Sequence, residues 1–114
     1  MPIPLDVIFR GMEPSPALET EVAARVEHLE HLYDRILRCR VTVDSPHHHQ
    51  QRGRLFNIHV ALSVPGREIT VDHAHPHDAA HKDVYVALAD AFEAAKRQLQ
   101  DHARIARHDV KSHV

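Results

Sequence analysis

Apolar residues recur with two different periods along this chain, and the changes of period divide it into elements. From Ile3 to Phe9 every second residue is apolar, which predicts a half-buried strand. Ser15 and Pro16 then match a helix N-cap followed by proline at the first helical position. Apolar residues recur from there every three or four positions, so we expect a helix over residues 16–33.

The middle of the chain returns to the period of a strand. Alternate residues are apolar from Leu37 to Val43 and again from Phe56 to Leu62, with a polar loop between the two runs. A turn at residues 64–67, with proline before glycine, leads into a further strand through Ile69 and Val71. The polar positions on the opposite face of these strands are Arg38, Arg40, Asn57, His59 and Thr70.

One long amphipathic helix is expected after the strands, over residues 79–107. Its apolar stripe consists of Tyr85, Leu88, Phe92, Ala95 and Leu99. The order β-α-β-β-β-α, with one apolar face on every strand, predicts an α+β fold. We expect a four-stranded mixed sheet with both helices packed on one face, and the first two strands parallel. The expected domain covers residues 1–108, and residues 109–114 form a short basic and histidine-rich tail.

Length and composition narrow the class of protein. The chain has 114 residues, 43% of them hydrophobic, which suits a single domain with one core. Its single cysteine, Cys39, excludes an internal disulfide and is typical of a reducing cytosol. No window approaches the roughly 18 apolar residues of a membrane span, and the N-terminus does not have the pattern of a signal peptide. We therefore expect a cytoplasmic protein without a membrane partner.

The net charge of −2 conceals a strong segregation of charge. Residues 1–36 hold three basic and seven acidic side chains, whereas residues 96–114 hold five basic and two acidic ones. The basic end also contains histidines, and a patch of this kind attracts phosphate backbones without reading sequence. The chain has 13 histidines, which gain charge between neutral pH and about pH 5.5. On its own this patch is weak evidence for a nucleic-acid ligand, because the chain as a whole is not basic.

Catalytic motifs do not emerge from the sequence. No Ser-His-Asp arrangement is apparent, and the three glycines are too scattered to form a phosphate-binding loop. Cys39 is predicted to point inward from a strand, where a thiol usually serves only packing. We therefore expect a protein that is not an enzyme and needs neither a cofactor nor a small-molecule substrate.

A histidine-rich metal-binding module for zinc or nickel is the alternative. His73, His75 and His77 occupy alternate positions, which share one side of an extended segment. His77 and His81 are four residues apart, a spacing that suits a metal if the helix begins that early. Neither cysteine nor glutamate accompanies this set, so it does not match a specific zinc signature.

Several motifs occur in the same order as in one known family. The first helix contains PSPALETEV and LEHLYDRI, the last helix contains DVYVAL and RQLQDH, and VPGRE forms the turn between two strands. Over residues 3–103 the chain resembles the ribosome hibernation promoting factor family, also called ribosome-associated inhibitor A or sigma modulation proteins. It resembles the short form, which ends after the N-terminal domain.

The resemblance implies a bacterial, cytoplasmic stress factor that inhibits translation without catalysis. Such proteins bind 16S-type rRNA of the small ribosomal subunit around the decoding region, where they exclude mRNA and tRNA, and this one is expected to be monomeric. Alignment with the family carries RNA-binding roles over to Arg25, Arg97 and His102, and His28 stands where the family commonly has lysine. Charge alone adds Lys96, Arg104 and Arg107 to the predicted RNA-binding set.

Overall fold

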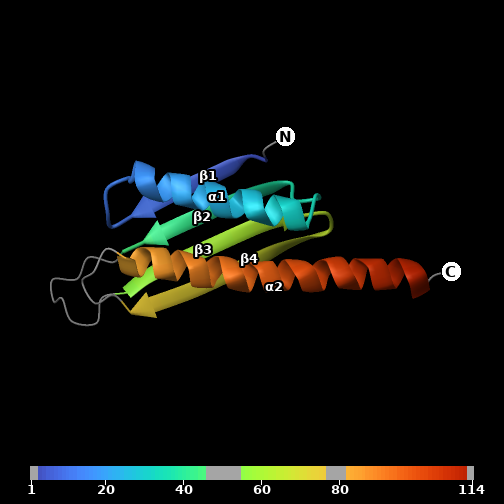
Figure 1. The fold of residues 1–114 in the computed structure, drawn as a ribbon. Coiled ribbons are helices and arrows are strands. Elements are labelled where there is room, and N and C mark those ends of the chain that lie inside the picture. Colours follow the sequence, from blue (N-terminus) through green and yellow to red (C-terminus); the bar gives the residue numbers. More distant parts are fainter. Residues whose placement is uncertain (1–2, 46–54, 77–81, 113–114) are drawn as a thin grey trace.

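The structure, a computed structural model, describes residues 3–45, 55–76 and 82–112, and the side chains of residues 3–45, 56–73 and 84–105. Its elements follow the predicted order (Figure 1). In chain order they are β1 (Leu5–Arg10), α1 (Pro16–Leu32), β2 (Arg38–Asp44), β3 (Leu55–Val64), β4 (Arg67–Pro76) and α2 (Lys82–Ser112).

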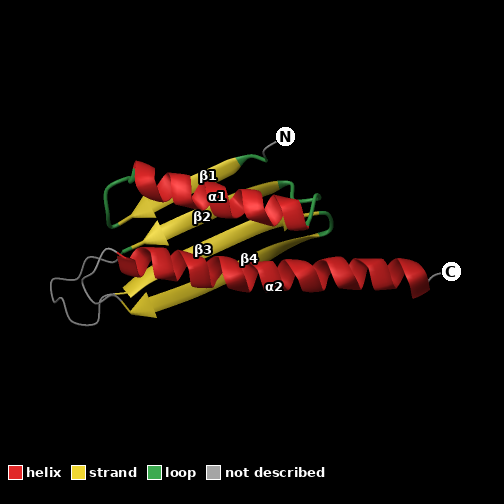
Figure 2. Ribbon diagram, viewed as in Figure 1, coloured by secondary structure: helices red, strands yellow, loops and turns green. Residues whose placement is uncertain are grey.

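The strands form one four-stranded sheet in the order β1-β2-β3-β4. β1 and β2 are parallel, and the other two pairs are antiparallel, as the order of elements predicted. Both helices lie on the same face of the sheet (Figure 2), with α1 against β1 and α2 against β3 and β4. The predicted α+β fold is therefore confirmed.

The core fills the layer between the sheet and the two helices. The register places Leu5 opposite Cys39 and Cys39 opposite Leu62, so inward-facing apolar residues form continuous rows across the strands. Every buried residue among those described is apolar or is Cys39. The helices contribute the apolar stripes that the sequence predicted, which include Leu18, Val22, Val26 and Leu29 from α1 and Leu88, Phe92, Ala95 and Leu99 from α2.

Local signals in the sequence define the ends of α1 and the turn between β3 and β4. The backbone N–H of Leu18 donates to Oγ of Ser15 over 3.2 Å, which makes Ser15 the N-cap. Pro16 occupies the first turn, where its missing N–H costs no helical hydrogen bond. Gly66 has φ +88°, the left-handed conformation that the third residue of a type II turn requires. Pro65 before it supplies the fixed φ of the second residue.

Two residues that the periodicity placed in the core are exposed. Leu37 is 57% exposed, because β2 begins only at Arg38 and Ile36, which is 4% exposed, occupies the core position instead. Tyr85 is 36% exposed, because the buried stripe of α2 starts at Val84 and the next residue is rotated by about 100°. The core assignment of both residues was wrong.

The last helix is longer than expected and ends later. It runs from Lys82 to Ser112, whereas the sequence indicated residues 79–107. At 1.5 Å per residue a helix of 31 residues is about 46 Å long. The C-terminal turns of α2 extend past the ends of the strands (Figure 1). The predicted tail therefore begins inside this helix. None of the helices in the described part of the chain is long and apolar enough to cross a membrane.

Candidate nucleic-acid interface

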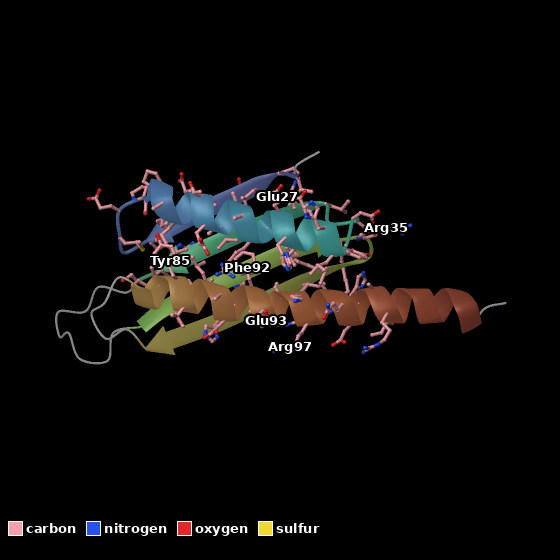
Figure 3. The ribbon with its side chains drawn as sticks, viewed as in Figure 1. Glu27, Arg35, Tyr85, Phe92, Glu93 and Arg97 are labelled. Atoms are coloured by element: carbon pink, nitrogen blue, oxygen red, sulfur yellow. The ribbon has the colours of Figure 1, made fainter. Side chains whose placement is uncertain are left out.

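A shallow groove separates α1 from α2 and brings three of the predicted RNA-binding residues together. Arg25 and His28 line it from α1, and Lys96 lines it from α2. Its volume is about 230 Å³, and Phe92, which lies between the two helices in Figure 3, forms part of its wall together with Leu29. Packing of the two apolar stripes therefore fixes the spacing of these three cationic or titratable groups.

Arg25 is already paired within its own helix. Its Nε lies 2.8 Å from Oε2 of Glu21, one helical turn earlier, and both side chains are about two-thirds buried. An i, i+4 pair of this kind stabilises a helix by about 0.3–0.5 kcal/mol and reduces the positive potential outside it. The charge of Arg25 is therefore partly compensated within its own helix.

Arg97 and Arg104 lie on the outward side of α2. Nη2 of Arg104 lies 2.8 Å from Oδ1 of Asp101, and both side chains are mostly exposed. Arg97 projects from the side of α2 away from α1 (Figure 3). In the described part of the chain, neither Lys96 nor Arg97 forms an ion pair, so no paired carboxylate compensates the charge of either side chain.

His102 packs against the end of α1. Its ring makes an edge-to-face contact with Tyr33, with 5.8 Å between ring centroids and 82° between ring planes. Tyr33 is the C-cap of α1, and its N–H donates to the carbonyl of Leu29. His102 therefore helps to hold the two helices together, whatever contact it makes with a ligand.

Arg107 belongs to the turns of α2 that extend past the sheet (Figure 1). From Lys96 onward this helix has five basic and two acidic residues, and from Lys82 to Ala95 it has one basic and three acidic residues. α1 has four glutamates and a single arginine, a net charge of −3. The positive charge of the two helices is therefore concentrated in the C-terminal half of α2, and α1 is acidic.

The histidines proposed as metal ligands are only partly within the described residues. His73 and His75 both belong to β4, at positions whose register partners, Ile58 and Phe56, are core residues. Nε2 of His73 lies 3.6 Å from Oδ2 of Asp90 on α2. His77 and His81 lie outside the described residues. Within the described part of the chain, no group of three His, Cys, Asp or Glu side chains is placed to hold a metal ion.

Cys39 is buried in the core, as its position on the strand predicted. Burial, with a smaller contribution from the charge of Glu30, raises the pKa of the Cys39 thiol from 9.0 to about 12. The nucleophilic thiolate is therefore not populated at neutral pH, and the thiol acts as an apolar packing group.

The sequence interpretation missed three features of this surface. Spacing in the helices allowed both ion pairs to be anticipated, because Glu21 precedes Arg25 by four residues and Asp101 precedes Arg104 by three. The contact of Tyr33 with His102 joins residues far apart in the chain, and no local pattern signals it.

Known proteins share this fold and this sequence pattern. The profile described as Sigma 54 modulation protein / S30EA ribosomal protein matches residues 5–107. The crystal structure of the Thermus thermophilus Protein Y N-terminal domain is 20% identical, with a TM-score of 0.66 over 90% of this chain and 99% of that one. A ribosomal subunit interface protein from Coxiella burnetii is 15% identical, with a TM-score of 0.67 over the same shares of the two chains, 90% and 99%. No curated protein sequence matches significantly. The chain belongs to the Sigma 54 modulation protein / S30EA ribosomal protein family, whose members are ribosome-binding modulators and not enzymes.

Proposed function

We propose that this protein is a hibernation factor that binds rRNA of the small ribosomal subunit around the decoding region. Bound there, it excludes mRNA and tRNA by its bulk and keeps idle ribosomes inactive during stress. It acts in the bacterial cytoplasm as a monomer. No bond is made or broken, so inhibition depends on affinity and position alone.

The excess of basic residues on the C-terminal half of α2 is the observation that carries this proposal. Lys96 and Arg97 keep their full charge, and Arg104 and Arg107 follow on the same helix. Arg97 projects from the side of α2 away from α1, and the last turns of α2 extend past the ends of the strands, so this half of the helix is open to a phosphate backbone. Membership of a ribosome-binding family makes rRNA the matching nucleic acid.

The two halves of the predicted site differ in what they contribute. On α1, Arg25 is paired with Glu21, and His28 shares its groove with Glu93. We therefore expect most of the RNA affinity to come from α2, with a smaller part from α1. The chain has 13 histidines, a residue type that gains charge between neutral pH and about pH 5.5, so we expect binding to tighten between pH 7.5 and pH 6.

Cosedimentation with purified small subunits, together with inhibition of cell-free translation, tests the proposal. The triple variant Lys96→Ala, Arg97→Ala, Arg104→Ala should bind more weakly and reduce the slope of log K against log salt by roughly 2–3. A control triple, Arg38→Ala, Arg40→Ala, Arg67→Ala, changes the net charge equally but lies on the sheet. Equal losses in both triples, or no loss in the first, would contradict the assignment of the surface to α2.

A further inference from the structure

A second and larger groove lies between α1 and the start of β1. Its volume is about 690 Å³, and its apolar wall includes Ile3, Leu5, Val26 and Ile36. Glu27, Glu30 and Asp34 also line this α1–β1 groove, together with His31. Glu27 lies on the side of α1 away from α2 (Figure 3), so this groove is separate from the one that holds Arg25 and Lys96. Among the residues that the structure describes, neither lysine nor arginine lines it.

The groove runs beside an unpaired edge of the sheet. The carbonyls of Pro4 and Arg10 accept hydrogen bonds from the N–H groups of Cys39 and Ser45, so the even-numbered residues of this segment direct their main-chain groups toward β2. Main-chain groups alternate in direction along a strand, so those of Leu5, Val7 and Phe9 face the other way. In the described part of the chain β1 pairs only with β2, and its outer edge has no strand partner.

Apolar walls, carboxylates and an open strand edge together define the ligand. We propose that the α1–β1 groove binds an extended, lysine- or arginine-rich segment of a partner protein, which adds to β1 as a further strand. Alternate side chains of an extended peptide point to opposite sides. Because α1 covers only one side of the sheet, the cationic side chains of the segment, directed to that side, lay their aliphatic stems on Leu5 and Ile36 and reach Glu27, Glu30 and Asp34 with their charged groups. The alternate, apolar side chains then lie on the open side of the sheet.

Two other occupants fit less well. The first alternative occupant is RNA, but the three carboxylates of the groove repel its phosphates, and RNA should bind to the positive half of α2 instead. A second copy has six of its 14 lysines and arginines on α2, which is helical through Ser112 and therefore does not present an extended strand. Its other edge strand, β4, has one arginine against Glu68 and Asp72, so it is not a cationic segment. The proposal adds a protein-binding surface to the RNA contact proposed above, and neither depends on the other.

Fluorescence anisotropy with a defined peptide tests the proposal. The probe is a fluorescein-labelled, C-terminally amidated peptide of sequence Lys-Val-Arg-Val-Lys-Val, compared with Lys-Gly-Arg-Gly-Lys-Gly and with Glu-Val-Glu-Val-Glu-Val. The apolar cationic peptide should bind the intact chain more tightly than either comparison peptide. The groove variant Glu27→Gln, Glu30→Gln, Asp34→Asn should weaken that binding by about tenfold or more, because it removes all three acidic partners. The control variant Glu13→Gln, Glu19→Gln, Glu68→Gln alters the net charge equally at exposed sites outside the groove.

Amide shifts in the NMR spectrum of the intact chain provide an independent measurement of strand addition. On titration with the Lys-Val-Arg-Val-Lys-Val peptide, the amides of Leu5, Val7 and Phe9 should shift and exchange more slowly with solvent. No binding, equal weakening in the two variants, or shifts centred on Arg25 and Lys96 would overturn the proposal. A uridine decamer that shifts the same three β1 amides would overturn it in favour of RNA, and concentration-dependent shifts of these amides without peptide would overturn it in favour of a second copy.

Discussion

Removing two carboxylates should make this protein a tighter RNA ligand. Glu21 holds Nε of Arg25 at 2.8 Å, and Asp101 holds Nη2 of Arg104 at the same distance. Each carboxylate competes with a phosphate for its arginine and also repels that phosphate directly. The double variant Glu21→Gln, Asp101→Asn keeps side chains of the same size and releases both arginines.

The size of the gain follows from counterion release. Each newly neutralised phosphate releases roughly 0.9 counterions, which at 0.15 M salt is worth about 1 kcal/mol. Two released arginines should therefore tighten binding by up to about 2 kcal/mol, or roughly thirtyfold, and steepen the salt slope by up to about 2. The loss of two helical ion pairs should lower the free energy of unfolding by no more than about 1 kcal/mol.

Filter binding to a fragment of small-subunit rRNA, measured from 50 to 300 mM salt, gives both affinity and slope. Glu13→Gln, Glu68→Gln is the matched control, because it changes the net charge equally outside both helices. A gain in the paired variant no larger than in the control would refute the reasoning, since net charge alone would then account for it. An unchanged slope would show that the released arginines do not reach phosphate.

Three further predictions concern the fold. Leu88→Ala, at a fully buried position of α2, should lower the free energy of unfolding in urea by about 3–5 kcal/mol, whereas Val86→Ala, at a position 43% exposed, should change it by less than about 0.5 kcal/mol. Cys39 should react with a thiol reagent at pH 8 far more slowly in the native chain than in urea, because burial raises its pKa to about 12. Because the pKa of Cys39 is higher in the folded chain, its contribution to the free energy of unfolding is fully present below pH 9.0. That contribution should be lost as the pH rises from 9.0 toward 12. Gly66→Ala should destabilise by about 1–2 kcal/mol although no atom lies within 4 Å of the added Cβ, because φ is +88° there; equal stability in a melting experiment would exclude backbone strain at this turn.

The sequence predicts this fold well because its elements differ in period. Alternation from Phe56 to Leu62 and the three-and-four spacing from Leu18 to Leu29 each leave one apolar face, and one layered arrangement buries all of them. The burial of two residues was mispredicted. Leu37 lies just outside the end of a strand, and Tyr85 lies beside the buried stripe of its helix; the period of apolar residues alone defines neither the end of a strand nor the exact position of a stripe on a helix.

The candidate surface is less accessible to sequence reasoning. The basic residues of α2 are apparent from composition, but the charge that a ligand meets depends on which carboxylate each arginine contacts. Arg25 and Arg97 each follow a glutamate by four residues, yet among the described residues Arg25 forms an ion pair and Arg97 does not. The α1–β1 groove depends on how α1 packs against the neighbouring strand β1, and the spacing of residues along the chain does not predict that packing.

The absence of buried charge among the described residues also bears on how such a protein can change over time. Every ionisable side chain described, apart from the Cys39 thiol, lies at least partly in solvent, where a substitution usually shifts stability by less than about 0.5 kcal/mol. The acidic residues of α1 can therefore be replaced by basic ones, one at a time, and each of the intermediate variants should still fold. One scaffold can in this way acquire new partners while its core remains constant.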